Sequence, residues 1–314
     1  MGLISMIWKN KSKLLIIDGR NLLWRTSDAF SELFVVKNDK HIVTGGIYGF
    51  LSNLIKIHQK HGGKTVVAWE GKGNFRFKLY SEYKNRPKED WYEELLEEIN
   101  DQQKRLQSIL RLMGVEQYKA VGCEADDVMA TLAKRWTLTG ERQAIIYTAD
   151  SDLRQCVDEY VSVVSPKRAG KEEAYDTKKT KEVDGVYPKY IADLKALAGD
   201  TSDRIPGVKG VGKVTAIKLI SSFGTIKSVI KAAKDKKSDW PVTERYRELI
   251  LKSKKDIKLF KKLTTVLFNA EMKEIKTRRS QKELVKHLMY YKFQSLMSSN
   301  ELYELMNMGK DEEE

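Results

Sequence analysis

Short hydrophobic runs alternate with longer amphipathic stretches over the first two thirds of the chain. Four of the runs are short enough, and rich enough in β-branched residues, to be buried parallel strands. They are KLLIID (13–18), TVVAWE (65–70), QAIIYTAD (143–150) and YVSVVS (160–165). Three stretches repeat apolar residues at the spacing of amphipathic helices: 47–61, 91–114 and 124–136. This alternation predicts an α/β fold with a mostly parallel central sheet and flanking helices.

The pattern changes beyond the last of these strands. Residues 165–186 are polar and charged, and from Tyr190 onward the chain is typical of helices broken by glycine, proline and lysine-rich turns. The sequence ends in GKDEEE, an acidic composition that does not pack into a core. We therefore expect an α/β domain at residues 1–186, a helical region at 187–306 and an acidic tail at 307–314.

Charge indicates the chemical class of the partner. The 314 residues include 57 Lys and Arg against 44 Asp and Glu, and the formal net charge is +13. Residues 201–270 hold 17 basic and 6 acidic side chains, a local net charge of +11. A charge distribution so uneven favours a polyanion such as nucleic acid over a surface that is basic only for solubility.

Cysteine content and hydropathy exclude several classes of protein. Cys123 and Cys156 occur without a CxxC motif, so neither a disulfide framework nor a zinc site is indicated. No apolar run approaches the ~20 residues that a membrane-spanning helix needs. We therefore expect an intracellular, cytoplasmic protein with no membrane partner.

Acidic residues follow several of the predicted strands. Asp18 ends the first strand, Glu70 ends the second, and Asp150 and Asp152 follow the third. Ligands of an open parallel sheet bind beyond the carboxyl ends of its strands, so we expect these side chains to converge there. The i, i+2 spacing in TADSD would place Asp150 and Asp152 on one side if the strand continues through them.

Two further acidic groups lie outside the strands. Glu124, Asp126 and Asp127 occupy three of four consecutive positions, and Asp200 and Asp203 are three apart. One acid is favourable in the first turn of a helix, but several together repel one another unless a cation is bound. All the candidate ligands are oxygen atoms, which favours Mg²⁺ or Mn²⁺ over zinc or copper, and their number suggests two ions.

A glycine-rich segment, GVKGVGKVT at residues 207–215, fits the G-x-x-x-x-G-K pattern of a phosphate-binding loop. The fit fails at Val214, where such a loop needs Ser or Thr for Mg²⁺, so an ATPase is disfavoured. A tight turn between helices is the better interpretation: its glycines let the backbone approach a phosphate, and a helix that begins near Lys213 presents its N-terminus to it. An ordinary helical hairpin is the alternative. The candidate phosphate-contacting residues are Gly207, Lys209, Gly210, Gly212, Lys213 and Lys218.

Several motifs together resemble the flap endonuclease or 5′ nuclease family, which includes bacteriophage 5′ exonucleases and the 5′ nuclease domain of bacterial DNA polymerase I. They are IIDGRNLLWR, FRFKLYSEYKNRP, GCEADDVMA, TADSDLRQ and LKALAGDTSDRIPGVKGVGKVTAIKLI, and they lie within residues 14–224. The resemblance implies a PIN-like α/β nuclease fold and a helical arch at about residues 76–112. It also implies a helix-three-turn-helix, formed around the glycine turn, that grips duplex DNA.

The resemblance further implies roles for individual side chains. The basic matches are Lys84 and Arg25 for catalysis, Lys195 for phosphate contact and, more weakly, Arg86. Two Mg²⁺ or Mn²⁺ ions would be held by Asp18, Glu70, Glu124, Asp126, Asp127, Asp150, Asp152, Asp200 and Asp203. Backbone carbonyls around Val208 and Val211 would hold a potassium ion. Without the resemblance, Lys84 is equally well a solvated surface charge.

Three departures from the family pattern bear on these roles. Glu70 stands where the family usually has Asp, and this leaves its direct contact with metal open. The YKNR spacing is one residue tighter than usual, which affects the match of Arg86. Arg204 follows Asp203 where the family frequently has Asn.

The activity implied is that of a structure-selective 5′ nuclease, both flap endonuclease and 5′-3′ exonuclease, that hydrolyses DNA by two-metal-ion catalysis. The expected partners are DNA 5′ flaps, overhangs and junctions, together with RNA-primed 5′ ends, and the expected state is a monomer. A phage gene expressed in a bacterial host is one source considered. Two rival functions remain. One is a PIN-type endoribonuclease, which lacks the helix-three-turn-helix, and the other is a junction-binding DNA protein without cleavage.

Overall fold

The computed structural model describes residues 12–85 and 90–310. This part of the chain forms two compact units. Unit 1 contains residues 12–72, 90–149 and 268–310, and unit 2 contains residues 73–85 and 150–267. Each unit is therefore built from segments that are separated in the sequence.

Unit 1 combines a sheet with helices. Its sheet strands are β1 (Lys13–Asp18), β4 (Lys64–Lys72), β5 (Glu116–Val121), β6 (Gln143–Tyr147) and β9 (Met272–Ile275). Its helices are α2 (Gly19–Ala29), α3 (Gly45–His61), α5 (Asp90–Met113), α6 (Ala125–Trp136), α13 (Gln281–Tyr290), η4 (Gln294–Met297) and α14 (Ser299–Asn307). A separate antiparallel hairpin consists of β2 (Phe34–Lys37) and β3 (Lys40–Val43).

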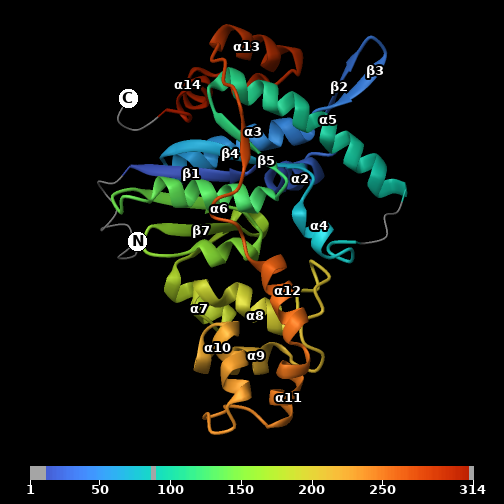
Figure 1. The fold of residues 1–314 in the computed structure, drawn as a ribbon. Helices are drawn as coiled ribbons and strands as arrows, with labels where there is room; N and C mark the ends of the chain where they lie inside the picture. The colour runs from blue at the N-terminus through green and yellow to red at the C-terminus, as the bar shows by residue number, and fades with distance from the viewer. Residues whose placement is uncertain (1–11, 86–89, 311–314) are drawn as a thin grey trace. The chain divides into compact units, whose positions relative to one another are not determined.

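The strands of unit 1 follow the order β6-β1-β4-β5-β9. β1 pairs in parallel with β4 and β6, β4 pairs in parallel with β5, and β9 pairs antiparallel with β5. Crossovers between parallel strands are right-handed, so the helices that lead from β1 toward β5 cover one face, whereas α6 leads back to β6 across the other (Figure 1). The predicted mostly parallel sheet with flanking helices is confirmed.

Burial explains why the central strands consist of unbroken apolar runs. Leu15, Ile16 and Ile17 of β1 are fully buried, as is Ile146 of β6. A strand covered by helices on both faces needs hydrophobic residues at successive positions, because neither face meets water. By contrast, β5 and β9 are not among the predicted strands, since polar residues interrupt both segments.

Unit 2 is mainly helical, as the pattern beyond Tyr190 predicts. Its helices are α4 (Phe75–Leu79), η1 (Ser151–Cys156), η2 (Arg168–Gly170), α7 (Thr177–Asp184), η3 (Pro188–Tyr190), α8 (Ile191–Ala198), α9 (Lys213–Phe223), α10 (Ile226–Lys234), α11 (Arg245–Lys252) and α12 (Lys254–Thr264). β7 (Val161–Pro166) and β8 (Glu172–Tyr175) form an antiparallel pair.

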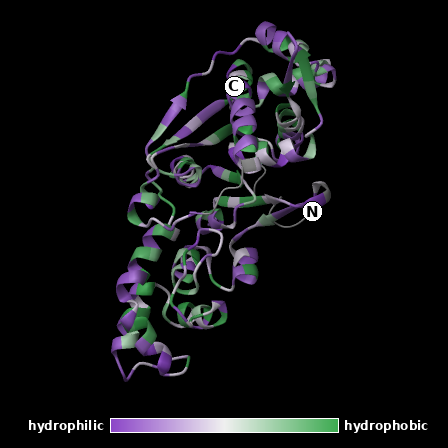
Figure 2. Ribbon diagram, turned by 90° about the vertical axis from the view of Figure 1, so that its right-hand side faces the viewer, coloured by the Kyte–Doolittle hydropathy of each residue, from purple (hydrophilic) through white to green (hydrophobic). Residues whose placement is uncertain are grey.

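The helices of unit 2 share an apolar core. Leu197, Leu219, Val229 and Ile250, from four different helices, are all buried in it. Figure 2 shows hydrophobic and hydrophilic residues alternating along the helices, as expected when one face of each packs inward and the other meets solvent. Most basic residues of α9 to α12 therefore lie on the surface of unit 2, whereas Arg247 of α11 is buried.

One buried acid fixes the arrangement of three of these helices. Asp193 of α8 is 4% exposed, and its Oδ1 accepts a hydrogen bond of 2.9 Å from the backbone N–H of Ile226, at the start of α10. Its Oδ2 accepts one of 2.7 Å from the amine of Lys261 on α12. Because α8 also carries Lys195, this anchoring positions a candidate site residue.

Cys123 and Cys156 are both buried, and no disulfide joins them. Among residues 12–85 and 90–310, no helix is both long and apolar enough to cross a membrane.

Candidate metal site and nucleic-acid interface

Asp18 lies where β1 ends and α2 begins. Its Oδ1 accepts a hydrogen bond of 2.9 Å from the backbone N–H of Asn21, which caps the helix. Its Oδ2 accepts one of 2.8 Å from the hydroxyl of Thr148, which follows β6. The carboxylate is therefore held at the carboxyl edge of two neighbouring strands, where the sequence predicts it.

Glu70 lies toward the carboxyl end of β4, the other neighbour of β1. Asp18 is in register with Ala68, two residues before Glu70, so both acids belong to the same edge of the sheet. The Oε1 of Glu70 accepts a hydrogen bond of 3.2 Å from the backbone N–H of Ala125, the first residue of α6. Glu70 thus positions the helix that carries the next acids, whereas its direct contact with metal stays a prediction.

The three acids at the start of α6 have different surroundings. Glu124 and Asp127 form a capping box, in which each side chain accepts a hydrogen bond from the other residue's backbone N–H. The bond from Glu124 N–H to Asp127 Oδ2 is 3.0 Å, and both side chains are buried. Asp126 is half-buried and belongs to no capping box. The density of acids is therefore explained in part by capping, and their contacts with metal stay predictions.

Helix α2, which begins at this edge, carries two basic residues, Arg20 and Arg25. Arg25 is exposed, and its catalytic role stays a prediction. Arg20 is not among the predicted residues, yet its Nη1 donates to Asn100 at 2.9 Å and to Gln103 at 3.1 Å on α5. Burial lowers the pKa of the Arg20 guanidinium, while the charges of Tyr92 and Glu70 act in the opposite direction. The signal that could have found Arg20 is its place two residues after the acid in IIDGR.

The predicted strand to Asp150 is too long, and the condition that would place Asp150 and Asp152 on one side is not met. β6 ends at Tyr147, and the segment from Ser151 to Cys156 is the 3₁₀ helix η1. Asp150 is its N-cap, because Oδ1 accepts a hydrogen bond of 2.8 Å from the backbone N–H of Asp152. A short acidic side chain that satisfies a nearby N–H competes effectively with strand formation.

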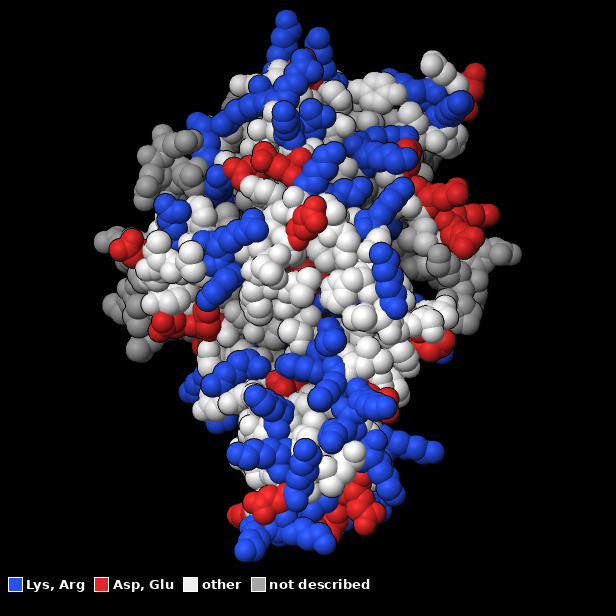
Figure 3. All heavy atoms as spheres, viewed as in Figure 1, with Lys and Arg blue, Asp and Glu red and all other residues white. Residues whose placement is uncertain are grey.

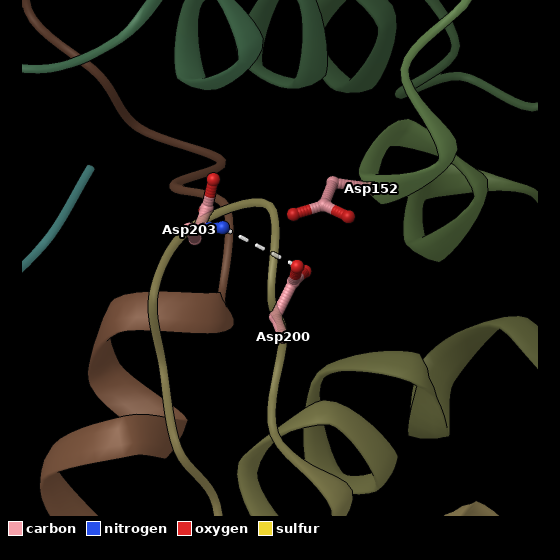
Figure 4. A group of neighbouring side chains, drawn as sticks. All are labelled: Asp152, Asp200 and Asp203. Atoms are coloured by element: carbon pink, nitrogen blue, oxygen red, sulfur yellow. Dashed lines mark hydrogen bonds between the residues drawn. The ribbon is translucent and has the colours of Figure 1, made fainter. Parts of the chain in front are cut away.

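Three carboxylates of unit 2 form a tight group (Figure 4). Asp152 comes from η1, and Asp200 and Asp203 come from the loop that follows α8. Each offers one carboxylate oxygen, and these oxygens lie within 4.8 Å of one another. Within residues 12–85 and 90–310 it is the one group of three or more acids, histidines or cysteines with that spacing. The structure thus brings together three of the nine predicted metal ligands in one place.

The loop that carries Asp200 and Asp203 is closed on itself. The backbone N–H of Asp200 donates to the carbonyl of Ile205 at 2.7 Å, and the reverse bond is 2.8 Å. Asp200 Oδ1 also accepts hydrogen bonds from the backbone N–H and the hydroxyl of Ser202. These contacts fix the two carboxylates relative to each other.

Lys195 lies among these acids, because its amine bonds Asp152 and also Asp200 Oδ2 at 2.6 Å. Desolvation would raise the pKa of Asp200, but the charge of Lys195 and hydrogen bonds from Lys195 and Ser202 outweigh it and lower the pKa. Asp200 is therefore an ionised oxygen donor that a neighbouring cation already stabilises. The three carboxylates together form a donor set that fits a hard divalent metal ion.

Lys84 is presented to the same loop from the segment after α4. Its backbone N–H donates to the carbonyl of Asp203 at 3.1 Å, and its Nζ lies 3.6 Å from Asp203 Oδ1. The neighbouring Tyr83 is 1% exposed and donates from its hydroxyl to Asp203 Oδ2 at 2.9 Å. Lys84 has a φ of +49°, a conformation that non-glycine residues rarely adopt. Lys84 is exposed, and its backbone is held in this conformation by Asp203, while its catalytic role stays a prediction.

The anchoring of this segment extends to α12. Arg76 of α4 is 2% exposed, and its guanidinium donates at 2.9 Å to the carbonyls of both Leu263 and Thr265 at the end of α12.

Burial raises the pKa of Asp150, while Lys195 and Lys84 oppose that shift. Both lysines thus act electrostatically on this acid as well as on the group of three.

The glycine turn precedes α9, which begins at Lys213 as predicted. Gly207 and Gly210 have φ of +66° and +87°, so the backbone requires glycine at both. A Cβ on Gly207 would also meet the backbone nitrogen of Gly199 at 2.3 Å. Gly212 differs: its φ is −81°, and a Cβ there would meet no atom within 4 Å. Neither the backbone nor the packing of unit 2 explains a glycine at that position.

The basic residues of the turn are exposed. Lys209, Lys213 and Lys218 all lie on the surface. Figure 3 shows that Lys and Arg predominate over the helices α9 to α12, which follow the turn. Val208 and Val211, whose carbonyls are predicted to hold potassium, are buried, and the Val208 carbonyl accepts a hydrogen bond of 2.8 Å from Val211 N–H. The predicted helix N-terminus and lysines therefore occur together on one exposed turn.

Two predictions cannot be placed. Arg86 lies outside the described residues. The predicted arch at 76–112 comprises α4 in unit 2 and α5 in unit 1, with residues 86–89 outside the described part of the chain, so the arch stays a prediction.

Comparison with known proteins gives the family. The family model of the 5′-3′ exonuclease N-terminal resolvase-like domain matches residues 13–185. The family model of the 5′-3′ exonuclease C-terminal SAM fold matches residues 186–286. A 5′-3′ exonuclease of Aquifex aeolicus is 31% identical over 263 residues, which are 83% of this chain and 86% of that protein.

Two further matches extend the comparison. DNA polymerase I of Bacillus caldotenax is 35% identical over 250 residues, which are 78% of this chain but 28% of the polymerase, so the chain spans little more than a quarter of that relative. A flap endonuclease of bacteriophage T5, in a pseudo-enzyme-product complex with DNA and metal ions, has the same fold, with a TM-score of 0.64 and 19% identity over 95% of this chain and 99% of its own. By its sequence, and with a fold that agrees, the chain belongs to the 5′-3′ exonuclease family.

Proposed function

We propose that this chain is a structure-selective 5′ nuclease that acts as a flap endonuclease and 5′-3′ exonuclease on DNA. The observation that carries the proposal is the group of Asp152, Asp200 and Asp203, with carboxylate oxygens within 4.8 Å of one another and two lysines at its border. An all-carboxylate donor set is suited to a divalent ion, and adjacent amines are suited to the charge of a phosphate.

The predicted acids would hold two Mg²⁺ or Mn²⁺ ions. When bound, such ions stabilise charge on the scissile phosphate and lower the pKa of the attacking water. The part of the chain's own residues is to fix the donors: the closed loop orients Asp200 and Asp203, and the N-cap of η1 orients Asp150. Lys84, held through Asp203, would face the negative charge that develops on the phosphate.

The helical part of unit 2 would bind the duplex portion of the substrate. The exposed N-terminus of α9, the glycine turn and its lysines together form the kind of surface that binds backbone phosphates. We place the potassium ion at the carbonyls around Val208 and Val211. The DNA would be a 5′ flap, overhang or junction, with RNA-primed 5′ ends as further substrates, and the protein would act intracellularly as a monomer.

The rival functions make different demands on the chain. A PIN-type endoribonuclease does not need a glycine turn that leads into a basic helix. A DNA-binding protein that does not cleave does not need a tight group of carboxylates. The direct test is incubation of 5′-labelled flap DNA and of single-stranded RNA with Mg²⁺ or with chelator, followed by gel electrophoresis. We expect Mg²⁺-dependent cleavage of the flap. Cleavage of RNA alone, or binding of the flap without cleavage, would contradict the proposal.

Gly212→Ala is expected to weaken binding to duplex DNA while leaving the fold intact. The added methyl group meets no protein atom, but it would stand at the exposed start of α9 and obstruct the approach of a phosphate. Fluorescence anisotropy with duplex and single-stranded oligonucleotides measures the effect, and a thermal melt checks the fold.

Gly207→Ala is the contrasting variant for this experiment. It is expected to lower the melting temperature, because its φ is positive and the methyl group would collide with the backbone of Gly199. Unchanged duplex affinity for Gly212→Ala would show that the turn serves the fold alone.

A further inference from the structure

An open groove of about 570 Å³ runs beside the start of α9, within unit 2. One wall is formed by Val214, Thr215 and Lys218 of α9, and the other by Trp240, Pro241, Val242, Thr243 and Tyr246, just before and at the start of α11. Val214 is 71% exposed, although it is an apolar residue in the first turn of a helix. No residue of this second wall was predicted from the motifs.

One cation, Lys218, lines the groove, and two more, Lys213 and Arg245, are chain neighbours of lining residues. Lys213, Lys218 and Arg245 have no carboxylate within ion-pair distance among the described residues. The Nη2 of Arg245 lies 3.9 Å from the place that a Cβ on Gly210 would take, so this guanidinium stands directly beside the glycine turn. The groove thus joins apolar surface to unneutralised positive charge.

The aromatic rings of the groove are half-buried, and each already has a guanidinium beside it. Trp240 stacks on Phe223 at 5.6 Å and has the guanidinium of Arg247 at 4.6 Å from its ring. Tyr246 has the guanidinium of Arg245 at 5.2 Å from its ring. Proteins that hold unpaired bases do so on accessible aromatic faces, so single-stranded nucleic acid is disfavoured as the occupant.

We propose that this groove binds the sugar-phosphate backbone of duplex DNA, as a continuation of the contact at the glycine turn. Deoxyribose would lie against Val214 and the Trp240–Tyr246 segment, and phosphates would face Arg245 and Lys218. The inference rests on the proposed function, because it names a second surface for the same substrate. It assigns Arg245 and Thr243, which no motif indicates, to the interface.

Arg245→Ala tests the groove through the salt dependence of binding. Loss of one phosphate contact is expected to reduce the slope of log Kd against log salt by about one for a duplex and to leave single-strand affinity unchanged. Lys252→Ala is the matched control, because Lys252 lies on the same helix and has Glu248 at 4.0 Å as its partner. An unchanged slope for Arg245→Ala would overturn the proposal.

Thr243 permits a test in both directions. Its side chain is exposed in the groove, so Thr243→Lys is expected to tighten duplex binding and raise the salt slope, and Thr243→Glu is expected to weaken binding. Equal affinities for the two variants would also overturn the proposal. If Gly212→Ala weakens duplex binding while the groove variants leave it unchanged, only the proposal for the groove is contradicted. If the parent neither binds duplex nor cleaves the flap, the proposed function fails.

A second inference comes from Arg204, the departure from the family pattern. Arg204 has a φ of +55°, and its guanidinium donates to the carbonyl of Asn85 and lies 3.9 Å from Glu82. Asp203, its neighbour, bonds both Tyr83 and Lys84. Asp203 and Arg204, which are adjacent in the loop after α8, therefore hold the chain on both sides of Lys84.

We infer that Arg204 is a positioning residue that acts through Lys84. Its side chain is 42% exposed, so it contributes no core packing, and its contacts are confined to the segment it holds. Arg204→Asn removes the contacts but suits the positive φ, which Asn tolerates. On the proposed function, we expect a single-turnover cleavage rate lower by roughly 10-fold or more, with unchanged Kd, because small displacements of a catalytic group are costly.

A double-mutant cycle distinguishes positioning from a general structural effect. In a Lys84→Ala background, Arg204→Asn is expected to have little further effect on the rate, because the lysine that it positions is gone. Arg111→Asn is the control, since Arg111 also donates to a carbonyl, that of Lys276 at 2.8 Å, away from the acids. Independent, multiplicative losses, or a parental rate for Arg204→Asn, would overturn the inference.

Discussion

Asp150→Asn is expected to reduce cleavage of flap DNA to background while leaving flap binding close to that of the parent. Asparagine caps a helix as well as aspartate does, so Oδ1 can still accept the hydrogen bond from Asp152 N–H that begins η1. The substitution therefore removes a charge from the predicted metal ligands without removing the local structure. Single-turnover cleavage and equilibrium binding in Ca²⁺ or chelator measure the two effects separately.

Asp176→Asn is the matched control for this substitution. Asp176 is also an N-cap in unit 2, where its Oδ1 accepts a hydrogen bond of 2.7 Å from Lys179 N–H, but it is not among the predicted metal ligands. It should keep the parental cleavage rate. A loss of flap binding in Asp150→Asn as large as its loss of cleavage would contradict the separation of chemistry from DNA grip.

Lys84→Ala is expected to lower the single-turnover cleavage rate by roughly 10²-fold or more, with little change in Kd. The physical reason is that an amine directed at developing phosphate charge acts mainly in the transition state. Rapid-quench measurements at saturating enzyme isolate this step from product release.

The positive φ of Lys84 needs its own control. Lys84→Gly removes the amine but suits the backbone, so an equal rate loss in Lys84→Ala and Lys84→Gly would assign the effect to the amine. Lys292 also has a positive φ, at +59°, and Lys292→Ala should shift the melting temperature without changing the rate. If Lys84→Gly cleaves at the parental rate, Lys84 has no catalytic role.

The sequence is most informative where structure is local. The run KLLIID matches β1 residue for residue, because a strand covered on both faces leaves a continuous apolar signal. The start of α9 at Lys213 is likewise predicted, since glycine and a following amphipathic pattern mark a helix boundary. The acids at the carboxyl edge follow from the same logic, as they directly succeed predicted strands.

What the sequence does not reveal are contacts between distant segments. Tyr83 and Asp203 are 120 residues apart, and Arg204 and Asn85 are 119 apart, so no periodicity links them. The end of the third strand was mispredicted for the opposite reason, because a local cap at Asp150 replaced the last residues of the expected strand. Capping by Glu124 and Asp127 was likewise hidden, because a capping acid and a metal-binding acid are the same residue type in a sequence.

The late position of β9 in the chain has a consequence for biosynthesis. β5 pairs with β4 on one side and with β9 on the other, but β9 is Met272–Ile275 and leaves the ribosome about 150 residues after β5. Until then, one row of β5 backbone groups has no strand to pair with, which is the condition under which nascent chains associate with one another. Once in place, β9 is four residues long, with Lys273 and Glu274 exposed, a composition that discourages further strand addition. The short strand therefore acts as a terminator that keeps the finished sheet from growing between molecules.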